Sequence, residues 1–306
     1  GFGSAKGSNE EAYLFQKLVR VGFGSNNVDH CTRLCHASSV AALMEGVGSG
    51  AVSAPFMAAA DADFIIVIGA RPEQNHPVAN TYFKQAAKAG KKIVVMDPRG
   101  QGLSRFAWRS LQFKPGADVA MLNAMLNVIV TEKLYDEQYI QANVDGFEAL
   151  KAKVADFTPE AMEPVCGIAA ATLREVARTY ATSERSIIFW GMGVSQHTHG
   201  TDNARCLIAL ALITGHVGRP GTGLHPLRGQ NNVQGASDAG LIPMVFPDYQ
   251  SVENPDVRGR FEDLWGRTLD PKRGLTVVEI IDEAYDGKIK AMYVQGENPA
   301  MSDPDQ

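Results

Sequence analysis

Two short runs of β-branched residues restrict the folds open to this chain of 306 residues more than any other feature. The runs are DFIIVIG at residues 63–69 and KIVVMD at residues 92–97, and a stretch compatible with a helix, residues 78–88, lies between them. A strand, a helix and a second strand in this order form a βαβ unit with parallel strands and a right-handed crossover. The sequence therefore predicts a parallel sheet.

The alternation of strand and helix patterns continues along the chain, which is typical of a doubly wound α/β layer. We expect a short strand at 111–113, a helix at 117–131 that Pro115-Gly116 starts, a helix at 170–182, a strand at 186–190 and a helix at 202–215. Outside this block we expect a helix at 9–21, an extended connection with little regular structure at 241–272, a helix at 277–285 and a closing strand at 289–295.

Two expected strand ends carry similar sequences. GARPEQNHP (69–77) follows the strand at 63–68, and GENPAMSDP (296–304) follows the strand at 289–295. Two related α/β domains would show such a sequence similarity if each used the same loop to bind a ligand, since ligands bind at the carboxyl ends of strands in open α/β sheets. G-x-x-P is also common in turns, so the spacing alone does not separate relation from chance.

Composition narrows the class of protein. Hydrophobic residues make up 45% and charged residues 21% of the chain, which is ordinary for a soluble globular protein. The net charge is −5 and the basic residues are scattered, so we expect no nucleic-acid partner. No apolar run approaches the roughly 18 residues that span a bilayer, and no secretory signal is visible. Four cysteines are too few for a disulfide framework, which favours a cytoplasmic location.

The densest group of potential metal ligands is HCTRLCH, residues 30–36. Structural zinc normally needs a second ligand pair, and Cys166 and Cys206 stand apart, so zinc is disfavoured. Spacing alone favours the interpretation that Cys31 and Cys35 are buried small apolar side chains. A third interpretation is one reactive or ligating thiolate whose pKa is lowered by cationic neighbours such as Arg33.

A Gly-rich polar stretch at residues 215–240 is the second candidate. Its glycines permit close backbone approach, and Arg228, Gln230 and Asn231 supply forked donors and acceptors. Structureless loops of more than about 12–15 residues are uncommon unless they are functional or disordered. We therefore favour a loop that binds a large, oxygen-rich ligand over a merely solvated one.

The strand ends give weaker signals. Asp97-Pro98-Arg99 closes the strand at 92–97, where an acid can bind a ribose or a guanine edge. The turn after the strand at 63–68 reads G-A-R-P and lacks G-x-G-x-x-G, which disfavours an ordinary nicotinamide dehydrogenase. His197 and His199 need not face one ligand, and we interpret them as loop histidines.

Taken together, these segments resemble the molybdopterin oxidoreductase family, and within it the catalytic subunits of cytoplasmic, NAD-linked molybdenum formate dehydrogenases. The resemblance runs along nearly the whole chain and is most specific in LCHASS (34–39) and RGQNNVQG (228–235). MDPR (96–99), FKPGADVAMLNAM (113–125), FWGMGVSQHTHG (189–200) and QGENPAMSDPD (295–305) also look like family segments.

The resemblance implies one Mo, or W, held by two molybdopterin guanine dinucleotides. It implies that Cys35 completes the metal shell, that His36 assists proton or hydride movement and that Arg228 holds the formate carboxylate. These types suit the chemistry, since thiolate is a soft ligand and guanidinium forks onto carboxylate. The implied dinucleotide contacts are Lys6, Gly69, Ala70, Arg71, Pro72, Asn75, Asp97, Pro98, Arg99, Gly116, Asp118, Met192, Gln196 and Gln230.

The expected fold class is α/β: two related doubly wound α/β domains with mainly parallel sheets, the second discontinuous and truncated. Residues 31–230 form the first, a pterin-dinucleotide-binding domain, and residues 1–30 with 231–306 form the second. The resemblance also implies iron–sulfur clusters in regions outside this chain, partner subunits that carry flavin and iron–sulfur clusters, and formate and carbon dioxide as substrate and product.

Two other functions stay open from the sequence. A nitrate-reductase-like oxyanion reductase shares the fold, but such enzymes typically lack His36 and Arg228. A cofactor-free α/β scaffold is the other, and it predicts that Cys35 resists alkylation, because a ligand-site thiol without its metal should be accessible.

Overall fold

The computed structural model describes residues 1–303. The chain divides into two compact units, one of residues 38–227 and one of residues 1–37 together with those from Arg228 onward. The sequence predicts domain boundaries between residues 30 and 31 and between residues 230 and 231. In the structure the chain passes from one unit to the other between residues 37 and 38 and between residues 227 and 228. Cys35, His36 and Arg228 consequently belong to the discontinuous unit. That the units are two related domains stays a prediction.

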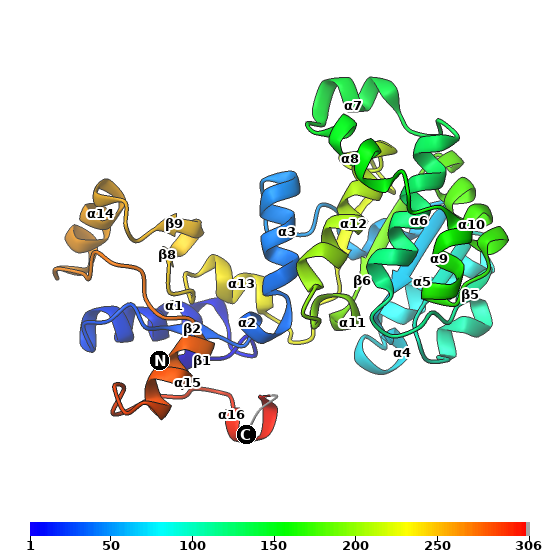
Figure 1. Cartoon of the computed structure of the whole chain (residues 1–306). Coiled ribbons are helices and arrows are strands. Elements are labelled where there is room, and N and C mark those ends of the chain that lie inside the picture. Colours follow the sequence, from blue (N-terminus) through cyan, green and yellow to red (C-terminus); the bar gives the residue numbers. More distant parts are fainter. Residues whose placement is uncertain (304–306) are drawn as a thin grey trace. The chain divides into compact units, whose positions relative to one another are not determined.

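A five-stranded parallel sheet organises the unit of residues 38–227, which carries the cyan and green elements of Figure 1. Its strands lie in the order β5-β4-β3-β6-β7. Their bounds are β3 Phe64–Ile68, β4 Lys92–Met96, β5 Arg109–Leu111, β6 Ser186–Trp190 and β7 Gly223–Pro226. In the register, Ile66 of β3 lies between Val94 of β4 and Ile188 of β6. The predicted parallel α/β sheet is confirmed.

Both faces of this sheet are covered, which explains why its central strand β3 is apolar throughout. Phe64, Ile66 and Ile68 point into one cluster, and Ile65 and Val67 into another. The first cluster packs against the long helices and the second against α5 and η2. Figure 1 shows α6, α9 and α10 together on one side of the sheet.

Helices lie between the strands along the chain of this unit. They are α3 Ala37–Val47, η2 Phe56–Ala60, α4 Pro72–Asn75, α5 Ala79–Lys88, η3 Gly102–Phe106, α6 Asp118–Thr131, α7 Glu137–Asn143, α8 Phe147–Val154, α9 Pro159–Cys166, α10 Ala170–Thr182, α11 Met192–Ser195 and α12 Gly200–Ile213. The helices expected at 78–88, 117–131, 170–182 and 202–215 are therefore confirmed to within two residues at each end.

The discontinuous unit is built on short parallel pairings. Strand β1 (Phe2–Gly3) pairs with β2 (Asp29–His30), and Phe2 also bridges Val294 in parallel. Strands β8 (Val245–Phe246) and β9 (Gln250–Ser251) are antiparallel. The helices are α1 Asn9–Lys17, η1 Leu18–Gly22, α2 Thr32–Cys35, α13 Val233–Asp238, η4 Pro247–Tyr249, α14 Pro255–Trp265, α15 Val277–Tyr285 and α16 Pro299–Ser302. Helices α1 and α15 each begin with a capping box, Ser8 with Glu11 and Thr276 with Glu279.

Three sequence-based expectations were wrong, and a fourth was displaced. The stretch 241–272 is not simply extended, because it contains α14. The stretch 215–240 is not one long loop, because β7 and α13 interrupt it. The closing strand expected at 289–295 is reduced to the bridge at Val294, since β1, its neighbour, is only two residues long. The short strand expected at 111–113 is present, displaced by two residues to 109–111.

Membrane insertion has no candidate element among residues 1–303. No helix in this part of the chain combines the length and the apolarity that crossing a bilayer requires.

Candidate functional site

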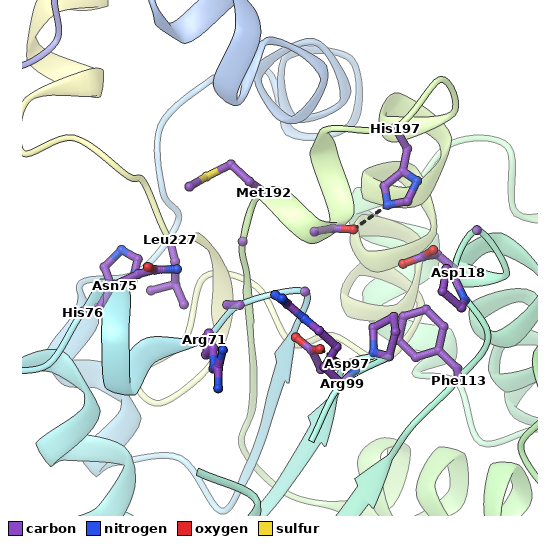
Figure 2. Close-up of a pocket in the computed structure, with 17 residues that line it drawn as sticks. Arg71, Asn75, His76, Asp97, Arg99, Phe113, Asp118, Met192, His197 and Leu227 are labelled. Atoms are coloured by element: carbon purple, nitrogen blue, oxygen red, sulfur yellow. Dashed lines mark hydrogen bonds between the residues drawn. The ribbon is translucent and has the colours of Figure 1, made fainter. Parts of the chain in front are cut away.

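A pocket of about 450 Å³ opens at the carboxyl ends of the sheet strands in the unit of residues 38–227 (Figure 2). The segments that follow all five strands contribute to it. Its lining residues are Gly69, Ala70, Arg71, Asn75, His76, Asp97, Pro98, Arg99, Phe113, Pro115, Gly116, Asp118, Gly191, Met192, Gly193, His197 and Leu227.

The strand order explains why the pocket forms here. From β3 the chain moves outward through β4 to β5, and then returns to the other side of β3 with β6 and β7. The loops after β3 and β6 therefore leave the sheet in opposite directions and open a crevice between them. Such switch points are the usual ligand sites of open α/β sheets.

Glycines let the two central loops approach each other closely. Gly69 has φ 58°, and its carbonyl oxygen accepts a hydrogen bond from Gly193 N at 2.9 Å. A Cβ atom on Gly191 or Gly193 would lie within 3.0 Å of the backbone at Gly69 or Ala70. No side chain fits at these positions, so the loop backbones themselves form the wall of the pocket.

The pocket contains charges of both signs. Arg71 and Arg99 provide cations, and Asp97 and Asp118 provide carboxylates. Asp118 is 1% exposed, and its Oδ1 atom has no hydrogen-bond partner in the described structure. Burial raises the pKa of Asp118, and the nearby imidazole of His197 opposes that effect. A buried carboxylate oxygen without a partner is suited to accept an N–H or O–H from a ligand.

Ten of the predicted dinucleotide contacts line this pocket: Gly69, Ala70, Arg71, Asn75, Asp97, Pro98, Arg99, Gly116, Asp118 and Met192. Within the described residues, Pro72 and Gln196 do not line it; Pro72 begins α4 and Gln196 follows α11. Sequence reasoning missed His76, His197 and the two glycines of WGMG. The two glycines follow β6 within three residues, which was a signal that could have identified them, whereas His76 and His197 come after the short helices α4 and α11.

The discontinuous unit brings together the residues expected at the reacting centre. Cys35 ends α2, and His36 follows it with φ −121°. Cys35 is 8% exposed and His36 is fully buried, so the expected accessible thiol is not what the structure shows. The Gly229 backbone N–H donates to the Cys35 sulfur, and the Arg228 guanidinium interacts electrostatically with it.

Burial raises the pKa of the Cys35 thiol, while Gly229 and Arg228 act in the opposite direction. Burial also lowers the pKa of Arg228, and Cys35, Tyr249 and Asp238 oppose that effect. Arg33 is not the cation beside Cys35, contrary to the sequence-based suggestion, because its Nε donates to Asp29 at 2.9 Å. The cationic neighbour is Arg228, which is distant in sequence.

The remaining predicted contacts, Lys6 and Gln230, also lie in the discontinuous unit. The Lys6 side chain is 60% exposed, and its Nζ is 4.0 Å from a carboxylate oxygen of Glu297. The Oε1 atom of Gln230 is buried and has no hydrogen-bond partner in the described structure. Both side chains therefore have polar atoms that a ligand could engage. Residues 1–303 contain no group of three or more His, Cys, Asp and Glu side chains placed to hold a metal ion.

The two similar sequence segments have similar backbones. Gly69 and Gly296 both have positive φ, 58° and 71°. Each glycine is followed three residues later by the proline that starts a four-residue helix, α4 at Pro72 and α16 at Pro299. Pro304, at the end of the second segment, lies outside the described residues. The likeness therefore extends from the sequence to the local structure.

The comparisons with known proteins agree with this architecture. The Molybdopterin oxidoreductase family model matches residues 1–306. The F420-dependent formate dehydrogenase subunit alpha of Methanocaldococcus jannaschii is 44% identical over 305 residues, which cover 99% of this chain and 45% of that protein. Formate dehydrogenase H of Escherichia coli K12 is 40% identical over 303 residues, covering 98% and 42%.

A solved structure is also similar. Acetylene hydratase from Pelobacter acetylenicus matches with a TM-score of 0.63 and 25% identity, over 70% of this chain and 29% of that one. The chain spans less than half the length of the two curated relatives. Because the family model matches from the first residue to the last, the chain belongs to the molybdopterin oxidoreductase family.

Proposed function

We propose that this chain is part of the catalytic subunit of a formate dehydrogenase, which oxidises formate to carbon dioxide, reversibly, with a molybdenum or tungsten bis(molybdopterin guanine dinucleotide). The observation that carries the proposal is the cluster in which the Gly229 N–H and the half-buried Arg228 guanidinium act on the buried Cys35 thiol, with the buried His36 next to it in the chain. Family membership alone does not decide the reaction, since one similar structure is named a hydratase.

The pocket of residues 38–227 suits one dinucleotide. It is a crevice of about 450 Å³ at the strand ends. Glycine backbones form part of its wall, and Asp118 offers an oxygen without a partner in the described structure. A guanine presents N–H donors that such an oxygen accepts, and Arg71 or Arg99 can pair with phosphate. Lys6 and Gln230 are the proposed contacts in the discontinuous unit.

Three residues would act on substrate and metal. The Cys35 thiolate is a soft ligand suited to molybdenum or tungsten. The Arg228 guanidinium can hold the formate carboxylate with two parallel hydrogen bonds. The His36 imidazole can take up the proton that formate oxidation releases, because imidazole binds a proton near neutral pH. The bound metal group supplies the acceptor for the two electrons.

Electron transfer beyond this chain is part of the proposal. We expect partner subunits carrying flavin and iron–sulfur clusters, and iron–sulfur clusters elsewhere in the full-length subunit. The M. jannaschii relative is named as F420-dependent, so a carrier other than NAD is a real alternative to the NAD linkage that the sequence suggested. We propose a cytoplasmic location, because the four cysteines are buried and outside disulfides.

Metal content and formate-dependent dye reduction of the full-length protein test the proposal. Wild type should contain Mo or W with pterin and reduce the dye, and Cys35→Ala should lose the reduction. Cys31→Ala is the matched control, because Cys31 is equally buried in the same segment and is not a proposed ligand.

Each other outcome selects a different function. Cofactor-loaded wild type that ignores formate and reduces nitrate would favour the oxyanion reductase, and Arg228→Ala should then leave nitrate turnover largely intact. If the full-length protein binds neither metal nor pterin, the result would favour the cofactor-free α/β scaffold.

A further inference from the structure

Gln101 is a buried amide that joins two walls of the pocket in the unit of residues 38–227. It follows β4 in the loop that begins with Asp97, and it is 8% exposed. Its Nε2 group donates to the carbonyl oxygen of Ala70 at 2.9 Å and to Oδ2 of Asp97 at 3.4 Å. Ala70 and Asp97 both line the pocket, whereas Gln101 lies behind them, outside its lining residues. One side-chain amide therefore connects the loops that follow β3 and β4.

The neighbours of this amide fix its direction. Only the nitrogen of a glutamine side chain can donate a hydrogen bond, and the Ala70 carbonyl and a carboxylate at Asp97 can only accept one. A flipped amide would place Oε1 against these two oxygens, so the nitrogen faces them. Oε1 is then buried without a hydrogen-bond partner in the described structure. Such an oxygen destabilises the fold, so the amide is better explained by its effect on the pocket than by stability.

The loop after β3 is held from two sides at consecutive peptide groups. The carbonyl oxygen of Gly69 accepts a hydrogen bond from the loop after β6 at 2.9 Å, and that of Ala70 accepts one from Gln101 at 2.9 Å. A second contact joins the loops after β3 and β4, because the Glu73 carboxylate accepts a hydrogen bond from Gly102 N at 2.7 Å. The pocket walls that follow β3, β4 and β6 are thus bonded to one another.

Asp97 is the side chain that this arrangement orients. Its Oδ1 atom accepts a hydrogen bond from Arg99 N at 2.8 Å, and its Oδ2 atom accepts the longer one from Gln101. Each carboxylate oxygen has more than one acceptor site, so both can still accept an N–H or O–H group of a ligand. A carboxylate that is already held at both oxygens loses less conformational freedom when the ligand binds. Preorganisation of this kind strengthens binding without a new contact.

We propose that Gln101 is a positioning residue for the bound dinucleotide, because it orients the Asp97 carboxylate and fixes it against the loop after β3. The inference rests on the dinucleotide-binding part of the proposed function. Gln101 touches no atom of the dinucleotide in this role. Its loss should therefore speed release of the dinucleotide while the sheet itself stays intact.

The test measures how fast the dinucleotide leaves the full-length, cofactor-loaded protein in cofactor-free buffer, followed as released guanine nucleotide and pterin. Gln101→Leu removes both donors and should speed release about tenfold, which is equivalent to about 1.4 kcal/mol. Gln101→Glu keeps nearly the same shape but places a second carboxylate beside Asp97, so release should be about 100-fold faster than in the wild type. Amide exchange of β3 and β4 should stay at the wild-type rate in Gln101→Leu, which separates positioning from unfolding.

Gln112→Leu and Gln112→Glu are the matched controls. Gln112 is an exposed amide that follows β5, and its Nε2 lies 3.2 Å from where a Cβ atom of Gly100 would be. It therefore lies beside the same loop as Gln101 and has no proposed bond to Asp97. Both control variants should release the dinucleotide within about twofold of the wild-type rate.

A double variant tests whether Gln101 acts through Asp97. The carboxylate that Gln101 orients is absent from Asp97→Ala. In that background, Gln101→Leu should therefore speed release by less than about twofold. An undiminished effect of Gln101→Leu in the Asp97→Ala background would contradict the proposal.

The outcomes separate this role from the proposed reaction. Wild type that holds the dinucleotide, with an unchanged release rate in Gln101→Leu or in Gln101→Glu, overturns the role of Gln101 and leaves the formate dehydrogenase proposal standing. If the release rates are as expected but the wild type does not oxidise formate, the proposed reaction fails and the role of Gln101 stands. Wild type that holds no dinucleotide removes both.

Discussion

Arg20 should be among the most sensitive positions for the stability of the discontinuous unit. Its side chain is 2% exposed, and all its hydrogen-bond acceptors are neutral. Three are the backbone oxygens of Gly240, Ile242 and Val245, at 3.3, 2.7 and 2.8 Å. The guanidinium carbon also lies 5.0 Å from the ring centre of Phe246. One buried cation therefore holds the segment 240–246 to the end of α1 and η1.

Arg20→Met keeps an unbranched side chain and removes every one of these donors. A buried polar group left without a partner costs about 1–3 kcal/mol. The carbonyl oxygens of Ile242 and Val245, which make the two short bonds, dominate that cost. Burying the cation in the wild type also costs free energy, which the substitution recovers in part. We expect a net loss of about 3 kcal/mol in the local unfolding free energy.

Hydrogen–deuterium exchange of the full-length protein measures this loss directly. The amide of Leu241 bonds to Ala236 O at 3.1 Å, and that of Val252 to Met244 O at 3.1 Å. A loss of about 3 kcal/mol should speed their exchange about 100-fold, since 1.4 kcal/mol is a factor of ten. Arg260→Met is the control, because Arg260 is exposed and donates to Gln250. Unchanged exchange in Arg20→Met would refute the assigned role of the guanidinium.

Two further predictions concern the unit of residues 38–227. Burial lowers the pKa of His216 from 6.5 to about 4. Between these pH values the unfolded state binds more protons than the folded state. The unfolding free energy therefore falls as the pH drops from 6.5 to 4, by up to about 3 kcal/mol. His216→Phe keeps an aromatic ring against Tyr180 and should make the unfolding free energy nearly independent of pH in this range, as measured by amide exchange of β6. An unchanged dependence on pH would contradict the assignment to His216. Asp118→Asn should weaken retention of the dinucleotide about 10- to 100-fold, measured as guanine nucleotide and pterin released per protein; full retention would mean that the unpartnered oxygen is not used.

The sequence predicted the central sheet well because its strands are buried on both faces. A run such as FIIVI is apolar at every position, which few other elements require. Helix α14 was missed for a physical reason. The stretch 241–272 is rich in Pro, Asp and Gly, which favours an extended connection, but Asn254 at the cap and Pro255 at the first helical position start a helix. The strand expected at 289–295 failed because a strand needs a partner, and β1 provides only two residues.

The pocket was predictable in its loops and less so in its side chains. Strand ends in a parallel sheet meet at one edge, so the loops after β3 and β4 could be placed from the sequence. Which loop side chains face inward depends on the path of the backbone. His197 lines the pocket because its Nε2 lies 2.8 Å from Gly193 O, and no periodicity records that contact.

The two cysteines of HCTRLCH show what three dimensions add. Cys31 and Cys35 are 9% and 8% exposed, so burial does not separate a core thiol from a metal ligand. Their partners do. Burial raises the pKa of Cys31 to about 12, and the Glu297 carboxylate opposes ionisation further. Each sulfur accepts a backbone N–H, Cys31 from Ala5 and Cys35 from Gly229, but Cys35 faces the cation of Arg228 where Cys31 faces the Glu297 carboxylate. Burial raises the pKa of both thiols, so the difference lies in the neighbouring charge: a cation almost 200 positions away in the sequence supports Cys35 over Cys31 as the proposed metal ligand.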